Sequence, residues 1–329
     1  MIRRLAFAGL ALVITVMVIA FFGQRHIASY GDQAVSLDKK IHYQLSSGTS
    51  MRKLVSELQQ LGIIEDALQL RLYSRMHDLQ AIKAGEYLLE PQMSHRQLLQ
   101  LFVSGQVVQR QITFVEGNRV RDYLKKLADK VAIEPAVKGL GVKEIAKQLG
   151  IEDGLLEGWV FPETYSYTKG DRDIDILKRS VTAMKKVLAQ EWASRAKGLP
   201  LKTPYEALVL ASIVEKETGA PEERAEIAGV FIRRLQKGMR LQTDPTVIYG
   251  MGDSYKGNIR RSDLKKYTAF NTYRIKGLPP TPIASPGREA IHAALHPASG
   301  KSLYFVAKGN GHHQFSATLV EHNRAVQNY

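Results

Sequence analysis

The sequence predicts an α+β protein that begins with one membrane-spanning helix and continues as a small module and a larger C-terminal domain. Three observations carry this prediction: an uncharged N-terminal run, two short strand-and-helix units after it, and then long amphipathic helices separated by strands and Pro/Gly-rich loops. At 329 residues the chain is long enough for about two domains. Its 44% hydrophobic content is ordinary for a protein that folds around a core, so disorder is not expected.

Charge and cysteine content exclude several classes of function. Lys and Arg number 46 against 32 Asp and Glu, which gives a formal net charge of +14. A basic surplus favours an acidic partner such as nucleic acid, anionic lipid or an acidic polymer. The chain has no cysteine, which excludes disulfides, zinc-thiolate sites, iron–sulfur clusters and thiol nucleophiles.

Residues 5–22, LAFAGLALVITVMVIAFF, predict a transmembrane anchor. Eighteen helical residues span about 27 Å, close to the thickness of a bilayer's hydrocarbon core. A cleaved signal peptide is the alternative, but its apolar region is usually about 7 to 15 residues and ends at small residues. This run ends in Phe21-Phe22-Gly23-Gln24, so we expect an uncleaved anchor.

The flanking charges orient this anchor. Arg3 and Arg4 predict that residues 1–4 form a cytoplasmic tail, although Arg25 beyond the span weakens the bias. The rest of the chain would then lie outside the cytoplasm. That location excludes nucleic acid as a partner and favours the membrane surface or a cell-wall polymer.

The segment after the anchor divides into a stalk and a module. Residues 23–40 are polar and predict a stalk. Residues 41–110 twice repeat the pattern of a strand, a turn, a Ser/Thr cap and an amphipathic helix, which ends first at Gly62 and then at Gly105. The repeat predicts one small module.

Residues 111–329 predict a mixed α+β domain. A strand and a helix open it, and helices are expected at about 174–196, 204–218 and 221–237. Residues 238–252 and the Pro-rich residues 277–287 are predicted loops. Residues 303–316 predict a hairpin with its turn at 309–311, followed by a short final helix.

Several familiar sites are absent from this domain. Gly300-Lys301-Ser302 lacks the upstream Gly of a phosphate loop, because Leu295 stands at that position. His292 and His296 are four residues apart, but no metal-binding carboxylate pattern accompanies them. No G-x-S-x-G motif is present. We therefore expect no metal and no cofactor.

The stretch ASIVEKETG, residues 211–219, is the strongest catalytic candidate. The residues before it are almost wholly apolar, which predicts a buried helix with Glu215 and Glu217 in its last turn. A desolvated carboxylate at the negative end of a helix favours its protonated form and suits a general acid. The two glutamates lie about 200° apart on the helix, so at most one faces a site. The alternative is that both are solvated at a frayed helix end.

The aromatic segment EGWVFPETYSYTKG, residues 157–170, also has two interpretations. Trp159, Phe161, Tyr165 and Tyr167 could stack on sugar rings, or they could pack in a core.

Longer motifs reveal a family. LASIVEKETG, VFIRRLQKGMRLQTDPTVIYGMG, NTYRIKGLPPTPIASPG, ALHPA and LYFVAKGNGHHQFSATLVEHN occur in that order. Together they closely resemble the catalytic domain of the endolytic murein transglycosylases, the YceG-like family. The resemblance extends upstream through EGWVFPETYSY and VEGNRV to KAGEYLLEPQMS and the single anchor. It implies that residues 41–110 are a LysM-like module and that residues 111–329 are the catalytic domain.

The resemblance implies a lyase that cleaves peptidoglycan between N-acetylmuramic acid and N-acetylglucosamine and leaves 1,6-anhydro ends. In that family the acid is the second glutamate of E-K-E, which is Glu217 here, a choice that helix geometry alone left open. Weaker candidates for substrate binding are Gln242, Asp244, Thr246, Asn271, Tyr273 and Glu163. Asp244-Pro245 could instead only shape a turn, and Asn271 and Tyr273 could instead pack.

The expected partners are peptidoglycan glycan strands and, by the family's associations, cell-wall synthesis enzymes. The alternative hypothesis is a non-catalytic, membrane-anchored peptidoglycan-binding scaffold in which Glu217 is structural.

Overall fold

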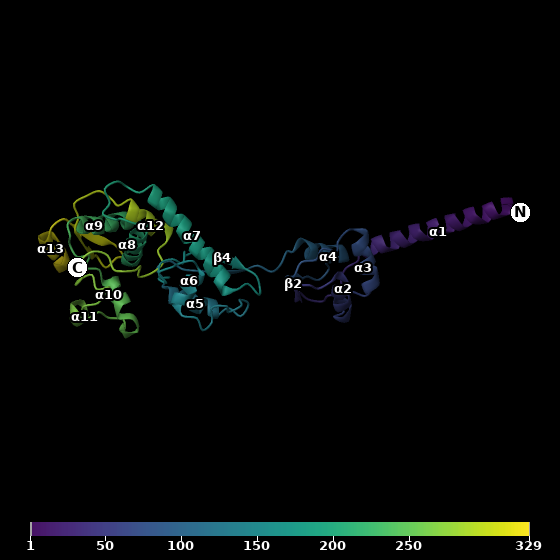
Figure 1. Ribbon diagram of the computed structural model, residues 1–329, viewed down its shortest axis with the longest axis horizontal. Coiled ribbons are helices and arrows are strands. Elements are labelled where there is room, and N and C mark those ends of the chain that lie inside the picture. The colour runs from purple at the N-terminus through teal and green to yellow at the C-terminus, as the bar shows by residue number, and fades with distance from the viewer. Residues whose placement is uncertain (1, 329) are drawn as a thin grey trace. The chain divides into compact units, whose positions relative to one another are not determined.

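The computed structural model describes residues 2–328, and Met1 and Tyr329 lie outside the described residues. The chain separates into two compact units, Met1–Arg110 and Gln111–Tyr329 (Figure 1). Each unit contains its own hydrophobic core, and the second unit contains two. The predicted mixed α+β class is confirmed, because helices alternate with three two-stranded sheets, β1–β2, β3–β4 and β5–β6.

Helix α1, Ile2–Tyr30, contains the predicted anchor. Its segment Gly9–Tyr30 has 22 residues and includes an 18-residue window with a mean hydropathy of 1.8, so it is long and apolar enough to cross a membrane. Large apolar side chains such as Phe21 and Phe22 are exposed along it. The predicted tail, residues 1–4, begins at Met1, which is not among the described residues.

The predicted stalk, residues 23–40, differs from the structure. Helix α1 continues through its first part to Tyr30, and Tyr30 and Val35 are buried in the core of the first unit. The Val35 N–H donates to the Met93 carbonyl at 2.9 Å. Isolated apolar residues in a polar segment carry no periodic signal, which is why the sequence pattern did not reveal this packing.

The first unit consists of β1 (Ile41–Leu45), α2 (Met51–Gln60), α3 (Ala67–Met76), β2 (Gly85–Leu89) and α4 (His95–Ser104). Strands β1 and β2 pair antiparallel, with Tyr43 opposite Tyr87. The predicted helix signals act as expected: Ser94 and Gln97 form a capping box, and Gly105 ends α4 in the left-handed conformation. The LysM-like assignment of this module stays a prediction.

The second unit has a longer series of elements. Its strands are β3 (Arg110–Thr113), β4 (Thr164–Tyr167), β5 (Tyr304–Ala307) and β6 (His313–Ser316). Its helices are α5 (Val120–Ala128), α6 (Val142–Gln148), α7 (Asp173–Ala193), α8 (Pro204–Glu217), α9 (Arg224–Gln236), α10 (Asp244–Met251), α11 (Arg261–Lys265), α12 (Arg288–Leu295) and α13 (Leu319–Asn328). Short 3-10 turns lie at Pro221–Glu223 and Gly252–Ser254.

The aromatic segment packs inward. Tyr165 and Tyr167 on β4 are buried with Phe114 and Tyr123 in one of the two cores of the second unit. Trp159 packs partly buried against both cores. Of the two interpretations of this segment, the structure supports core packing.

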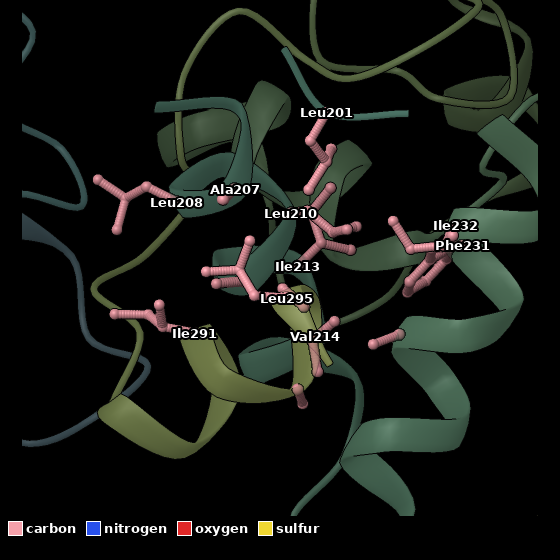
Figure 2. Close-up of a cluster of buried hydrophobic side chains, with 14 of the residues drawn as sticks. Leu201, Ala207, Leu208, Leu210, Ile213, Val214, Phe231, Ile232, Ile291 and Leu295 are labelled. Carbon is pink, nitrogen blue, oxygen red and sulfur yellow. The ribbon is translucent and has the colours of Figure 1, made fainter. Parts of the chain in front are cut away.

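The other core is built around α8. Thr203 caps this helix by accepting the Glu206 N–H, and Pro204 occupies its first turn, where a missing N–H has no cost. Every residue from Ala207 to Val214 is buried. Figure 2 shows Leu210, Ile213 and Val214 of α8 among side chains from α9 and α12. This packing fixes the end of α8, and therefore the position of Glu217.

Truncating this core is expected to destabilise the second unit. Ile213 is fully buried, so Ile213→Ala removes well-packed methyl groups and leaves a cavity. The free energy of unfolding should fall by about 2 to 5 kcal/mol. Thermal unfolding of wild type and variant measures this change, and Ile213→Val, with a cost of about 1 kcal/mol, is the matched control.

The prediction of a loop at residues 238–252 was wrong, because most of that segment forms helix α10. Thr243 stands at the N-cap position with an extended backbone, and Pro245 lies in the first turn, where its fixed φ favours a helix. Asp244-Pro245 therefore starts a helix. The segment is too short and too rich in Gly and Pro for its helical pattern to be recognised.

Candidate active site

Glu217 lies at a cleft of about 460 Å³ in the second unit. It comes from the last turn of α8, and the neighbouring wall is the segment from Leu241 to Asp244 with Tyr273. The remaining wall comes from the β5–β6 hairpin and α13. The cleft is lined by Glu217, Arg234, Leu241, Gln242, Thr243, Asp244, Tyr273, Tyr304, Phe305, Val306, Ala307, His313, Leu319, His322 and Asn323.

Glu217 is held in a form suited to proton transfer. Its carboxyl group is partly buried, and burial raises the pKa of Glu217 from 4.5 to about 7. Thr243 Oγ1 donates a hydrogen bond to Glu217 Oε1, which opposes that rise, and the negative charge of Asp244 adds to it. A carboxyl group with this pKa exchanges a proton readily near neutral pH.

A group of buried threonines positions Thr243. The Thr243 N–H donates to Thr272 Oγ1 at 3.0 Å, and Thr246 Oγ1 donates to the Thr243 carbonyl at 2.7 Å. Thr246 and Thr272 also share a hydrogen bond of 2.9 Å between their hydroxyls. Thr246, a predicted substrate-binding residue, is thus fully buried behind the cleft and supports the residue that contacts Glu217.

Glu215 faces a different environment. Its side chain is 7% exposed, accepts the Gly287 N–H at 3.0 Å and lies 4.0 Å from the Arg224 guanidinium. Burial raises its pKa, and the Gly287 hydrogen bond opposes that rise. Glu215 does not line the cleft. Of the two glutamates, only Glu217 lines the cleft.

The other predicted binding residues differ in where they lie relative to the cleft. Gln242, Asp244 and Tyr273 line the cleft, and Tyr273 donates its hydroxyl proton to Asp244 Oδ1 at 2.7 Å. Asn271 is buried, and its amide donates to the carbonyls of residues 263, 264 and 266 and accepts the Tyr273 N–H, so it shapes the loop. Glu163 is exposed, precedes β4 and does not line the cleft.

Gln242 adopts a strained backbone conformation at the cleft. Its φ of 53° lies in the left-handed region that non-glycine residues rarely occupy. Its N–H donates to the Thr272 carbonyl at 3.2 Å. Strain of this kind is held by the surrounding structure and concentrates at functional sites.

Sequence reasoning missed one wall of the cleft. Tyr304, His313, His322 and Asn323 come from the hairpin and the terminal helix, and Arg234 comes from α9. The motifs that contain these residues were visible, but no local pattern linked them to Glu217.

The fold also supplies a carboxylate that the His292/His296 pattern lacked. Ligand atoms of Glu191, His292 and His296 lie within 4.8 Å of one another, which would allow a metal ion. The Glu191 carboxylate already has hydrogen-bond partners, because Arg288 Nη1 and His292 Nδ1 each lie 2.8 Å from one of its oxygens. His296 Nε2 bonds the Ser194 carbonyl at 2.8 Å.

Comparison with known proteins gives the family. The model of the YceG-like family matches residues 43–328. The chain belongs to the YceG-like family. The match includes Glu217, the cleft and most of the first unit of this YceG-like protein.

Similar proteins carry a consistent name. A Bacillus subtilis protein named endolytic murein transglycosylase is 31% identical over 90% of this chain and 87% of its own length. A Streptococcus pneumoniae protein of the same name is 26% identical over 93% of this chain, which covers 61% of that longer protein. The crystal structure of a YceG-like protein from Listeria monocytogenes matches with a TM-score of 0.53 and 28% identity, over 88% of this chain and 99% of that one.

Proposed function

We propose that this protein is a membrane-anchored endolytic lytic transglycosylase of peptidoglycan. Its substrate would be the bond between N-acetylmuramic acid and N-acetylglucosamine in nascent glycan strands, and its product a 1,6-anhydro-muramic end. The observation that carries the proposal is Glu217, a partly buried acid whose pKa is raised to about 7 at the edge of a cleft. The names of the relatives support the same activity.

The proposed reaction uses Glu217 twice. The protonated carboxyl donates its proton to the glycosidic oxygen, the bond from that oxygen to C1 of muramic acid breaks, and N-acetylglucosamine leaves with a 4-hydroxyl. The Glu217 carboxylate then takes the proton of the muramic acid 6-hydroxyl as O6 bonds to C1. The carboxyl ends protonated and no water is consumed. One glutamate with a pKa near neutrality can perform both steps.

Asp244 would assist as a fixed negative charge. The transition state of glycosidic cleavage carries positive charge at C1 and the ring oxygen. Asp244 lines the same cleft, and the Tyr273 hydroxyl holds its carboxylate. Because the attacking hydroxyl belongs to the substrate, Asp244 would act electrostatically and would form no covalent bond.

Thr243→Val is expected to slow the reaction about tenfold, because a hydrogen bond to a charged carboxylate stabilises it by about 1.5 to 3 kcal/mol. Loss of the Thr243 donor would raise the pKa of Glu217 further and make its carboxylate form a less available base. The alkaline limb of the pH–rate profile should move to higher pH. Thr243→Ser retains the hydroxyl and should behave like wild type, and an unchanged profile in Thr243→Val would contradict this role.

The cellular arrangement follows from α1. We infer that this helix anchors the protein in the cytoplasmic membrane with a cytoplasmic N-terminus, so that the second unit works outside the cytoplasm where glycan strands lie. The net charge of +14 suits a surface between anionic lipid and a polymer that bears carboxylates. Cell-wall synthesis enzymes are the proposed protein partners.

Product analysis tests the proposal against the scaffold alternative. The full chain in detergent is incubated with intact peptidoglycan, and the released sugars are identified by mass spectrometry. Internal 1,6-anhydro-muramic ends support the transglycosylase. Reducing ends would indicate a hydrolase that uses water, and bound but uncut strands would indicate the scaffold.

A further inference from the structure

We propose that Arg234 and His322 form a subsite for a carboxylate group of the glycan strand, on the hairpin and α13 side of the cleft. The carboxylate would come from the lactyl ether of muramic acid or from its attached peptide. This inference rests on the proposed function, because it assigns part of the same cleft. It adds a basis for choosing between strands that carry different carboxylates.

Arg234 is a buried cation at the cleft that forms no salt bridge with a described residue. Its residue is 7% exposed, and among residues 2–328 it makes no ion pair. Nε and Nη1 donate to the carbonyls of Leu303 and Leu241, each at 2.6 Å, while Nη2 has no hydrogen bond among those described. A buried charge is costly unless it is paired. The Glu217 carboxylate and the Arg234 guanidinium interact electrostatically, but a protonated Glu217 carries no charge to balance the guanidinium.

His322 flanks the same ring as Arg234. The imidazole stacks on Tyr304 with ring centroids 5.3 Å apart, and the guanidinium carbon of Arg234 lies 5.1 Å from the Tyr304 centroid. His322 Nδ1 is buried and has no hydrogen-bond partner among the described residues. Arg234, Tyr304 and His322 all line the cleft. Two nitrogen-bearing groups therefore lie at one aromatic ring with hydrogen-bonding capacity unused.

These two groups fit a carboxylate better than a neutral sugar group. A guanidinium presents N–H donors in a plane that matches the two oxygens of a carboxylate, and charge-assisted bonds of this kind are about twice as strong as neutral ones. The pKa of His322 is lowered by burial and by the positive charge of Arg234, so a bound anion would be needed to charge both groups together. Asp244, whose carboxylate accepts the Tyr273 hydroxyl, disfavours a second anion beside it in the cleft.

Sugar hydroxyl and acetamido groups are neutral, so the anionic groups of a murein strand are its carboxylates. A denuded strand carries the lactyl carboxylate on each muramic acid. In a peptide-bearing strand that carboxyl is an amide, and the carboxylates lie along the peptide. Both the lactyl group and the peptide therefore offer a carboxylate, and binding of the two kinds of strand can be compared directly.

Binding measurements on the full chain in detergent, in a Glu217→Gln background that prevents cutting, test the subsite. Three probes are titrated calorimetrically: a chitin tetrasaccharide, a denuded murein oligosaccharide and its peptide-bearing form. Arg234→Gln should weaken binding of the carboxylate probes about tenfold or more and leave the chitin probe unchanged. His322→Gln, which breaks no hydrogen bond to the backbone, should weaken the same probes severalfold, and Arg234→Lys should retain part of the affinity.

The probes also identify the source. If the variants lose affinity only for the denuded strand, the bound group is the lactyl carboxylate. If they lose affinity only for the peptide-bearing strand, the bound group is a carboxylate of the peptide. If Arg234→Gln and His322→Gln in this background bind each probe as tightly as the Glu217→Gln parent, the subsite is overturned, even if wild type still forms anhydro ends. If Arg234→Gln weakens all probes while His322→Gln weakens none, Arg234 is only structural and the subsite is also rejected. If the Glu217→Gln parent binds no murein strand, the proposed function is rejected as well.

Discussion

Glu217→Gln is expected to lower the rate of anhydro-end formation by about 10² to 10⁴, the contribution typical of a positioned general acid and base. Glutamine has nearly the same shape and can still accept the hydrogen bond from Thr243, but its amide cannot donate a proton to the leaving oxygen. The fold should therefore survive. Mass spectrometric counting of internal 1,6-anhydro ends over time, beside a thermal unfolding curve, measures both effects.

Glu215→Gln is the matched control for this substitution. It changes the same residue type two positions away, and its amide oxygen can still accept the Gly287 N–H. Because Glu215 does not line the cleft, the rate should stay within about tenfold of wild type, the effect of one perturbed hydrogen bond. If Glu215→Gln were folded but as inactive as Glu217→Gln, that result would contradict the assignment of Glu217 as the general acid.

The second large expected effect is a pH-dependent gain in the stability of Glu217→Gln. The pKa of Glu217 is 4.5 in an unperturbed glutamate and about 7 in the folded protein. Between these values the unfolded chain releases the proton and the folded chain keeps it, so the contribution of Glu217 to stability is highest below pH 4.5 and falls until pH 7. The total loss is about 3 kcal/mol.

Glutamine does not titrate, so Glu217→Gln should be more stable than wild type by about 3 kcal/mol at pH 8 and similar to it at pH 4. The two tryptophans of the chain, Trp159 and Trp192, both lie in the second unit. Tryptophan fluorescence during denaturation therefore reports on that unit alone. An equal stability difference at both pH values would show that burial does not raise the pKa of Glu217.

The same pKa governs the rate. The acid must be protonated when the substrate binds, so activity should fall as pH rises above about 7. Loss of activity at high pH and gain of stability on substitution have one cause, because the fold holds a carboxyl group in an environment that disfavours its charge. Stability and catalysis oppose each other at this residue.

The candidate site was partly visible in the sequence. The apolar run before Glu217 predicted a buried helix end, and the family resemblance selected Glu217 over Glu215. Gln242, Asp244 and Tyr273 were also found at the cleft. Thr246 and Asn271 belong to the same motifs but turn inward: Thr246 bonds the Thr243 carbonyl, and Asn271 bonds the carbonyls of residues 263, 264 and 266. A motif reports that residues belong together, and it does not report which of them face the solvent.

The sequence by itself determined the local features of this protein and its family. The helix caps, the apolar anchor, the strand-and-helix module and the position of Glu217 in a last helical turn all depend on residues within a few positions of one another. Such signals act through backbone hydrogen bonds and side-chain spacing along a single element.

Only the tertiary structure decided what surrounds Glu217. Thr243, which bonds its carboxyl, is 26 positions away, and the wall with Tyr304 and His322 comes from the far end of the chain. These approaches depend on how α8, α9 and α12 pack into one core, which is a cooperative property of many buried side chains. The raised pKa of Glu217 is likewise a product of burial in that assembly, and no stretch of sequence contains it.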